Sequence, residues 1–375
     1  MSALALMALV GLTVFLSFFI DDADDTDDTE EVDSTDTPAD PDDPLGPAVD
    51  RDEIDGSGDA DTLTAQSGET VAGLGGADVM TTAPGSEGAI IDGGDGDDTL
   101  ELFGSSATAR GGAGDDTIAS FDVLDAEVDG GAGNDSIVFQ PLTPGTNQSA
   151  AGSVDGGAGN DTITAFGIGG EVFGGEGDDL IQGQGSLLRL DGGAGDDTIG
   201  ADSADYGGGT PVFGGDGNDL ISLTNSPGFQ VGSTADGGAG DDVIQTQTFL
   251  DSGKSFDTLT GGSGADRFEL SFLGGAPTGD PVDAGIVTTI TDFLPGTDIL
   301  FVDTQLDPLA DGTAPTLARV TLSEEPDGSF TDLVFTTGTD EGSAPLMGTI
   351  RLLGTTGMTL DDLAFREGSE ISLIS

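Results

Sequence analysis

The chain has 375 residues and a formal net charge of −63, from 8 Lys and Arg against 71 Asp and Glu, and it contains no His, Cys or Trp. Without His or Cys it has no zinc site of the usual nitrogen and sulfur type, no His-based catalytic triad and no disulfide framework. The near absence of basic residues argues against nucleic acid as a partner, because phosphate binding needs positive charge.

Residues 1–20 form a candidate anchor or signal segment. Residues 2–20 are uncharged and mostly apolar, which is enough for a marginal membrane span or a signal-peptide core. The segment lacks a basic start and an A-x-A cleavage site. We therefore favour an uncleaved hydrophobic helix that anchors the chain over a cleaved signal, and we rank a buried core helix below both.

Residues 21–54 read as an acidic, disordered linker. Residues 21–53 hold sixteen Asp and Glu, four Pro and a single basic residue, Arg51. Such a segment cannot bury apolar area, and its charges repel one another. We expect a spacer that holds the following region away from a membrane, with weak calcium buffering as the alternative.

A repeated string, GGxG(D/N)D, dominates residues 55–267. Nine copies begin at Gly93, 111, 130, 156, 174, 192, 214, 237 and 261. Two weaker copies, GSGDADTL from Gly56 and GLGGADVM from Gly73, precede them. We read each weaker copy as carrying one extra residue before its Asp. The shortest spacing is 18 residues, which suits a coil of two short strands and two tight turns with tolerated insertions.

Two apolar positions recur in every copy. The first is eight residues into the copy: Leu100, Ile118, Ile137, Ile163, Ile181, Ile199, Ile221, Ile244 and Phe268. The second is two residues before it: Ile91, Ala109, Val128, Val154, Val172, Leu190, Val212, Ala235 and Leu259. β-Branched residues dominate, which favours two stacked parallel ladders with coils about 4.8 Å apart.

The turns between these ladders carry the candidate metal ligands. The sixth position is Asp in all nine copies: Asp98, Asp116, Asp135, Asp161, Asp179, Asp197, Asp219, Asp242 and Asp266. The fifth is Asp or Asn in eight copies and Ala265 in the last. Stacked carboxylates repel unless a cation neutralises them, and ligands that are all oxygen favour calcium. Nine turns leave about eight gaps, so we expect roughly eight Ca²⁺ ions. The alternative is that the acidic turns are merely solvated loops.

The repeat resembles the RTX (repeats-in-toxin) nonapeptide, GGxGxDxUx, over residues 55–303. The resemblance implies an all-β, right-handed parallel β-roll whose calcium ligands are the sixth-position Asp and carbonyls of the glycine-rich positions. The glycines at positions two and four carry those carbonyls: Gly94, Gly96, Gly112, Gly114, Gly131, Gly133, Gly157, Gly159, Gly175, Gly177, Gly193, Gly195, Gly215, Gly217, Gly238, Gly240, Gly262 and Gly264.

The spacing departs from family members that repeat the motif every nine residues. Here the second half of each coil lacks the glycine-rich motif, so we expect calcium on one edge of the roll only. The other edge takes all the insertions, and we expect any macromolecular partner there. The residues just before the glycines (Asp92, Asp129, Asp155, Asp191 and Asp236) read as turn formers or outer-sphere charges rather than ligands.

Residues 268–375 read as a β-rich cap. Alternating apolar stretches are separated by Pro and Gly turns. ITDFLPGTDIL resembles the segment that closes RTX rolls, and GTIRLLGTTGMTLDDLAF resembles the family's terminal cap. A solenoid needs a cap, because an open end exposes core and strand edges. In the family the extreme C-terminus is an uncleaved type I secretion signal, and SEISLIS is compatible with one. The hydrophobic N-terminal segment indicates a different export route, and the sequence does not decide between the two.

These features indicate a calcium-binding roll, secreted or on the surface of a bacterium, that folds on calcium binding outside the cell. Calcium and type I secretion machinery are the expected partners, with membrane contact through residues 2–20. The alternative is an adhesin, surface-layer or matrix protein that uses the variable edge. A polysaccharide-modifying enzyme ranks below both, and we expect no enzymatic activity: HExxH and G-x-S-x-G are absent.

Overall fold

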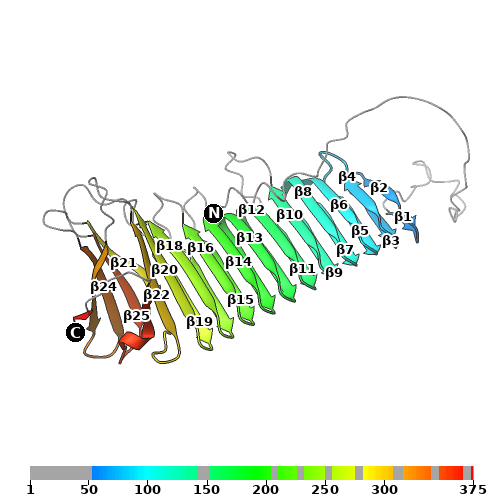
Figure 1. Ribbon diagram of the computed structural model, residues 1–375. Helices are drawn as coiled ribbons and strands as arrows, with labels where there is room; N and C mark the ends of the chain where they lie inside the picture. The colour runs from blue at the N-terminus through cyan, green and yellow to red at the C-terminus, as the bar shows by residue number, and fades with distance from the viewer. Residues whose placement is uncertain are drawn as a thin grey trace, which may run out of the picture. The chain divides into compact units, whose positions relative to one another are not determined.

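A computed structural model describes residues 53–141, 152–203, 209–225, 232–249, 256–274, 282–306, 316–338, 346–365 and 373–374. The predicted hydrophobic helix of residues 1–20 and the predicted acidic linker of residues 21–54 lie outside this part of the chain, except for Glu53 and Ile54, which begin strand β1 (Glu53–Ser57) instead. Within the described part, no helix is both long and apolar enough to cross a membrane. The expected all-β parallel solenoid is confirmed (Figure 1).

Each coil contributes one strand to each of two parallel ladders. The upstream ladder contains the strands that precede each glycine-rich turn: β1 (Glu53–Ser57), β3 (Thr70–Leu74), β5 (Ile90–Asp95), β7 (Thr108–Ala113), β9 (Glu127–Ala132), β11 (Ser153–Ala158), β15 (Pro211–Asp216), β17 (Thr234–Ala239), β19 (Asp257–Ser263), β21 (Val282–Ile290) and β25 (Leu346–Leu353). The downstream ladder contains those that follow: β2 (Thr62–Ala65), β4 (Val79–Thr82), β6 (Thr99–Ser105), β8 (Thr117–Leu124), β10 (Ser136–Pro141), β14 (Thr198–Ser203), β16 (Leu220–Asn225), β18 (Val243–Phe249), β20 (Arg267–Gly274), β22 (Ile299–Leu306) and β26 (Leu363–Phe365).

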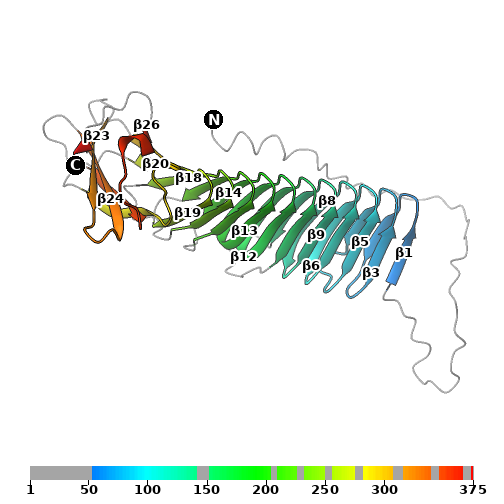
Figure 2. The ribbon, with the colours of Figure 1, turned by 90° about the horizontal axis from the view of Figure 1, so that it is seen from below.

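Two long strands run through both ladders. β12 (Thr162–Glu176) and β13 (Leu180–Ala194) pair in parallel along their length, and each belongs to an 18-residue coil with no insertion at the second edge. In longer coils, the inserted residues lie between the two strands, at the second edge. Both views show the strands of successive coils lying side by side (Figures 1 and 2).

The core is built as the sequence predicts. Every residue of the two apolar positions is at most 2% exposed. The parallel register places them in line, for example Leu100 on Ile118 and Ile91 on Ala109. Each coil therefore covers the apolar residues of its neighbours, and this stacking buries a continuous core in a chain with few large side chains.

The C-terminal cap changes the pairing from parallel to antiparallel. β23 (Thr316–Glu324), β24 (Phe330–Gly338) and β25 form an antiparallel meander, and β27 (Leu373–Ile374) pairs with β23. β25 also continues the upstream ladder by pairing with β21. A 3₁₀ helix, η2 (Leu360–Asp362), leads into β26, which continues the downstream ladder. The predicted β-rich cap is thus present and extends both ladders.

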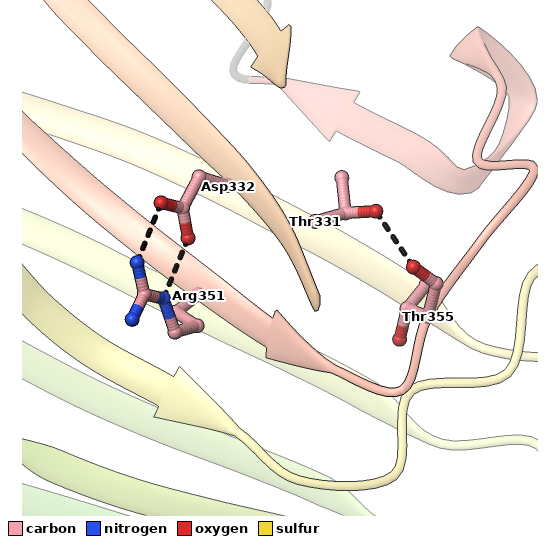
Figure 3. Close-up of polar contacts among 4 residues, drawn as sticks. All are labelled: Thr331, Asp332, Arg351 and Thr355. Carbon is pink, nitrogen blue, oxygen red and sulfur yellow. Dashed lines mark hydrogen bonds and ion pairs between the residues drawn. The ribbon is translucent and has the colours of Figure 1, made fainter. Parts of the chain in front are cut away.

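Polar side chains fasten the meander together and to the roll. The Arg351 guanidinium donates two hydrogen bonds to the Asp332 carboxylate, both of 2.8 Å (Figure 3). It also lies 3.8 Å from the centroid of the Phe330 ring. The Thr331 hydroxyl donates to the carbonyl of Thr355, 2.7 Å away. The hydroxyl of Thr355 in turn donates to the carbonyl of Phe293 in the roll-closing segment, 3.0 Å away.

Replacing Arg351 by lysine should destabilise the cap by roughly 1–2 kcal/mol, although the charge is kept. Lysine loses the two-pronged hydrogen bonding and the planar stacking on the Phe330 ring. Thermal unfolding of Arg351→Lys in saturating calcium measures the effect. Arg110→Lys, at an exposed site in β7, is the control and should change stability by less than about 0.5 kcal/mol. Equal stability of the two variants would contradict this role for Arg351.

Candidate metal centre

The sixth-position aspartates form a continuous hydrogen-bonded ladder along one edge of the roll. The backbone N–H of each Asp donates to Oδ1 of the Asp in the following coil, at 2.7–3.1 Å. All nine predicted aspartates take part, and each is at most 3% exposed. We call this row the aspartate ladder. It holds one carboxylate oxygen in place and aims the other into the gap between coils.

The ladder is longer than the sequence predicts. Asp61 and Asp78 continue it at the N-terminal end, with N–H to Oδ1 distances of 2.7 Å on to Asp78 and Asp98. Our reading of an extra residue in these two copies is wrong, because both aspartates occupy the sixth position. Leu74 and Ser57 stand where other copies have a second glycine, which hid the match. Leu74 accordingly has a φ of +72°.

The other end of the ladder is closed by the segment ITDFLPGTDIL. Asp298 accepts the N–H groups of Asp266 and Leu294 and so occupies the next ladder position. Asp292 accepts the N–H groups of Gly261 and Gly262, at 2.9 and 2.8 Å. Two carboxylates thus bind the last glycine-rich turn by hydrogen bonds alone. Neither was predicted, since no glycine motif surrounds them.

The second oxygen of the aspartates is buried and has no hydrogen-bond partner. This holds for Oδ2 in nine residues: Asp78, Asp98, Asp116, Asp135, Asp161, Asp179, Asp197, Asp219 and Asp242. A buried carboxylate oxygen without a donor is costly unless a cation compensates it. Of the predicted ligands only Asp266, in the last turn, falls outside this set.

A carbonyl of the following coil lies beside each of these oxygens. A Cβ placed on Gly192 would lie 2.2 Å from Oδ2 of Asp197 and 2.6 Å from the carbonyl oxygen of Gly214. The same two contacts recur from Gly73 to Gly237, at no more than 2.6 Å. The first glycine of each turn is therefore needed for space. Its carbonyl oxygen is a further candidate calcium ligand, which the resemblance did not indicate.

The glycines at positions two and four serve the turn in a different way. Both take positive φ, 98° at Gly94 and 136° at Gly96, which side chains disfavour. A Cβ on Gly112 would lie 2.1 Å from the carbonyl oxygen of Gly94 in the preceding coil, so these carbonyls point along the stack. The predicted carbonyl donors thus face the gaps between coils, although the free carboxylate oxygen lies beside the first-position carbonyl.

Replacing Gly192 by alanine should destabilise the calcium-loaded roll by about 1–3 kcal/mol, because the new methyl group fills the space between two oxygens. Chemical unfolding in calcium measures the loss. Gly200→Ala is the control, since its Cβ would meet only the amide of Gln182, the end of a flexible side chain. The interpretation fails if Gly192→Ala is as stable as Gly200→Ala.

Burial shifts the protonation of the ladder. Removal from water, aided by neighbouring carboxylates, raises the pKa of Asp116 and Asp197 to about 7. The same causes raise the pKa of Asp135, Asp179, Asp219, Asp242 and Asp266 to about 6. Without a counter-ion, these groups resist ionisation in the fold.

A second, exposed ladder runs beside the first in the opposite sense. The N–H of each fifth-position residue donates to Oδ1 of the fifth-position residue in the preceding coil, from Asp97 to Ala265. The acceptor can be Asn as well as Asp, because the hydrogen bond needs only Oδ1; three coils have Asn here, at Asn134, Asn160 and Asn218. Ala265 accepts nothing and ends the row. The fifth position is therefore structural.

The residues just before the glycines take no part in the hydrogen bonds of the aspartate ladder, although their charges lie near enough to raise the pKa of ladder residues such as Asp135 and Asp242. Asp92, Asp129, Asp155, Asp191 and Asp236 lie within strands of the upstream ladder and alternate with its buried residues. Asp191 pairs with Arg189, with 2.7 Å between Oδ2 and the guanidinium nitrogen. Among the described residues, no three acidic side chains gather into a cluster that could hold a metal by themselves. A cation at this edge would therefore need oxygen ligands besides these carboxylates, from backbone carbonyls or water.

The family comparison agrees with this geometry. The model described as "RTX calcium-binding nonapeptide repeat (4 copies)" matches residues 103–120, 151–167, 171–199, 233–247 and 249–271. The array is an RTX calcium-binding repeat. Copies outside the matches, such as those of Asp98, Asp135 and Asp219, hold equivalent places in the aspartate ladder. No curated protein matches the chain.

The RTX roll binds calcium, and its edge fits the ion chemically. Calcium takes six to eight oxygen ligands from carboxylates and carbonyls. Each gap offers an unpaired carboxylate oxygen and a neighbouring carbonyl. The ion would supply the positive charge that the buried carboxylates lack. The ladder residues and the glycine carbonyls would hold it.

Proposed function

We propose that this RTX roll is a non-enzymatic, calcium-triggered scaffold that folds outside the cell. The observation that carries the proposal is the set of nine buried, unpartnered Oδ2 atoms. The chain meets their desolvation cost when it folds, so calcium binding free energy becomes folding free energy. Nine such gaps favour nine ions, one more than the spacing of the strong copies suggests.

The difference in calcium concentration between the cytosol and the exterior leads us to place the folded roll outside the cell. Extracellular oxygen sites commonly work near 10⁻⁴–10⁻³ M calcium, far above cytosolic levels. The chain would stay unfolded inside a bacterium and fold after export. Type I secretion through the C-terminus, or anchoring through residues 2–20, would deliver it to the exterior or the cell surface. The acidic segment 21–54 would separate an anchored roll from the membrane.

The absence of an enzymatic role is also a proposal. The chain has no His or Cys and only one Tyr, Tyr206. Among the described residues, most buried carboxylates are already engaged in the aspartate ladder. Acid pairs at catalytic spacing arise by chance in a chain with 71 Asp and Glu, so such pairs carry no weight.

A calcium titration of the full chain tests the folding trigger. Far-UV circular dichroism and hydrodynamic radius are followed from nanomolar to ten millimolar calcium, with magnesium as the control ion. We expect steep compaction and a gain of β signal between about 0.1 and 1 mM calcium, but none with magnesium. A chain that is compact and β-rich in chelator would refute the proposal.

A further inference from the structure

From β4 to β18, the outer face of the downstream ladder is nearly free of charge, although the chain carries −63. The next strand of this ladder, β20, brings Arg267 and Glu269 to the same face and ends the uncharged stretch. The outward residues from β4 to β18 fall in three columns, each aligned by the parallel register. The first column is Val79, Thr99, Thr117, Ser136, Thr162, Leu180, Thr198, Leu220 and Val243. The second is Thr81, Glu101, Ala119, Val138, Thr164, Gln182, Gly200, Ser222 and Gln245. The third is Phe103, Phe121, Gln140, Phe166, Gln184, Asp202, Thr224 and Gln247.

These 26 positions, which we call the neutral face, contain two acidic residues and no basic one. The corresponding outward positions of the upstream ladder hold seven acidic and two basic residues between Ile90 and Asp236. Both faces are regular parallel sheet, so secondary structure does not account for the difference. One face of a strongly acidic roll therefore carries very little charge.

The neutral face also exposes apolar side chains in line. Val79, Leu180 and Leu220 in its first column are 49%, 47% and 36% exposed. In the third column, the rings of Phe103 and Phe121 stack with centroids 5.9 Å apart. Exposed apolar groups in one row indicate a contact surface more than scattered ones do.

We propose that the neutral face is the surface through which two copies of this chain pair, sheet against sheet. Between the two outer faces described, the neutral face lets two such acidic molecules approach with the fewest carboxylates opposite each other. The acidic upstream face lies on the far side of a sheet-on-sheet layer about 10 Å thick, so pairing through the neutral face keeps the acidic faces of the two copies apart. Salt weakens the repulsion that remains between them through the solvent.

The size of the face suits a stable dimer. Nine coils at about 4.8 Å span about 40 Å, and three outward residues along a strand span about 17 Å, which gives about 700 Å². Standard protein interfaces bury about 800 Å² per partner. Two flat parallel sheets can pack face to face, and a two-fold axis would place equivalent columns opposite each other.

Sedimentation velocity of the full, calcium-loaded protein tests the pairing. We expect a monomer–dimer equilibrium between about 1 and 100 μM protein, a range typical of modest interfaces. Added sodium chloride should strengthen the dimer, because both copies are acidic. A monomer at every protein and salt concentration would overturn the proposal.

Matched charge insertions locate the interface. The double variant Thr162→Glu/Thr198→Glu puts carboxylates on the neutral face, and Thr108→Glu/Thr234→Glu makes the same chemical change on the upstream face. We expect the first pair to weaken dimerisation at least tenfold, because like charges would meet at the interface. The second pair should leave it within about twofold. Circular dichroism in calcium confirms that both fold. Equal effects of the two pairs would refute the neutral face as the interface.

Discussion

Asp197→Asn should weaken the calcium-loaded roll and strengthen the calcium-free one. Asparagine keeps Oδ1, which accepts the N–H of Asp179 at 2.8 Å, so the ladder hydrogen bond survives. Its amide nitrogen replaces the unpartnered Oδ2 beside the carbonyl of Gly214. The same atom that calcium requires as an anionic oxygen thus becomes a neutral hydrogen-bond donor.

The two effects have opposite signs for one physical reason. With calcium bound, removing one partner of a buried charge pair costs about 3–5 kcal/mol. In chelator, the variant removes a buried charge and gives the Gly214 carbonyl a donor, which should gain about 1–3 kcal/mol. Because each coil stabilises its neighbours, loss of a central ion should also make the calcium titration less steep.

Denaturant unfolding of the full chain, in calcium and in chelator, measures the change in the free energy of unfolding under each condition. Asp196→Asn is the matched control, since it is one residue away and its position already accepts Asn in three coils. It keeps the Oδ1 that accepts the N–H of Asn218. We expect it to be nearly neutral in both conditions. If Asp197→Asn destabilised the chain in chelator as well, Oδ2 would have a structural role that the geometry does not provide.

Periodicity made most of this fold predictable from the sequence. A coil that repeats its apolar positions must bury them in register, so Leu100 through Phe268 and Ile91 through Leu259 were identified correctly. The sixth-position Asp repeats with the same period, so the sequence also predicted that these aspartates lie in one row. Insertions did not disturb the prediction of the two ladders, because the inserted residues lie at the edge that carries no motif.

The missed residues are those whose role does not need the motif. Asp78 was overlooked because Leu74 replaces a glycine, although Leu74 and Gly76 take positive φ of 72° and 116° and keep the turn. Asp292 and Asp298 end the array with hydrogen bonds to backbone N–H groups, so no glycines mark them. The neutral face is defined by the charge that it lacks, and that is visible only after the register is known.

In chelator, the chain should gain β structure as the pH falls from 8 to about 4.5. Burial raises the pKa of Asp116 and Asp197 to about 7 and of five further ladder residues to about 6, from an ordinary value of 3.8. The fold therefore binds more protons than the unfolded chain between these values. Stability is fully present below pH 3.8 and is lost as the pH rises through 6–7.

Calcium should reverse this dependence, because protons and calcium compete for the same carboxylates. In calcium-containing buffer, the midpoint of the titration should rise to higher calcium as the pH falls from 8 to 5, and binding should release protons near pH 6–7. Circular dichroism at several pH values, with and without chelator, checks both trends. Asp196→Asn, which alters the exposed ladder, should follow the parent chain at each pH. A calcium-free roll that unfolds on acidification would show that the aspartate ladder is ionised in the fold and that another group neutralises it.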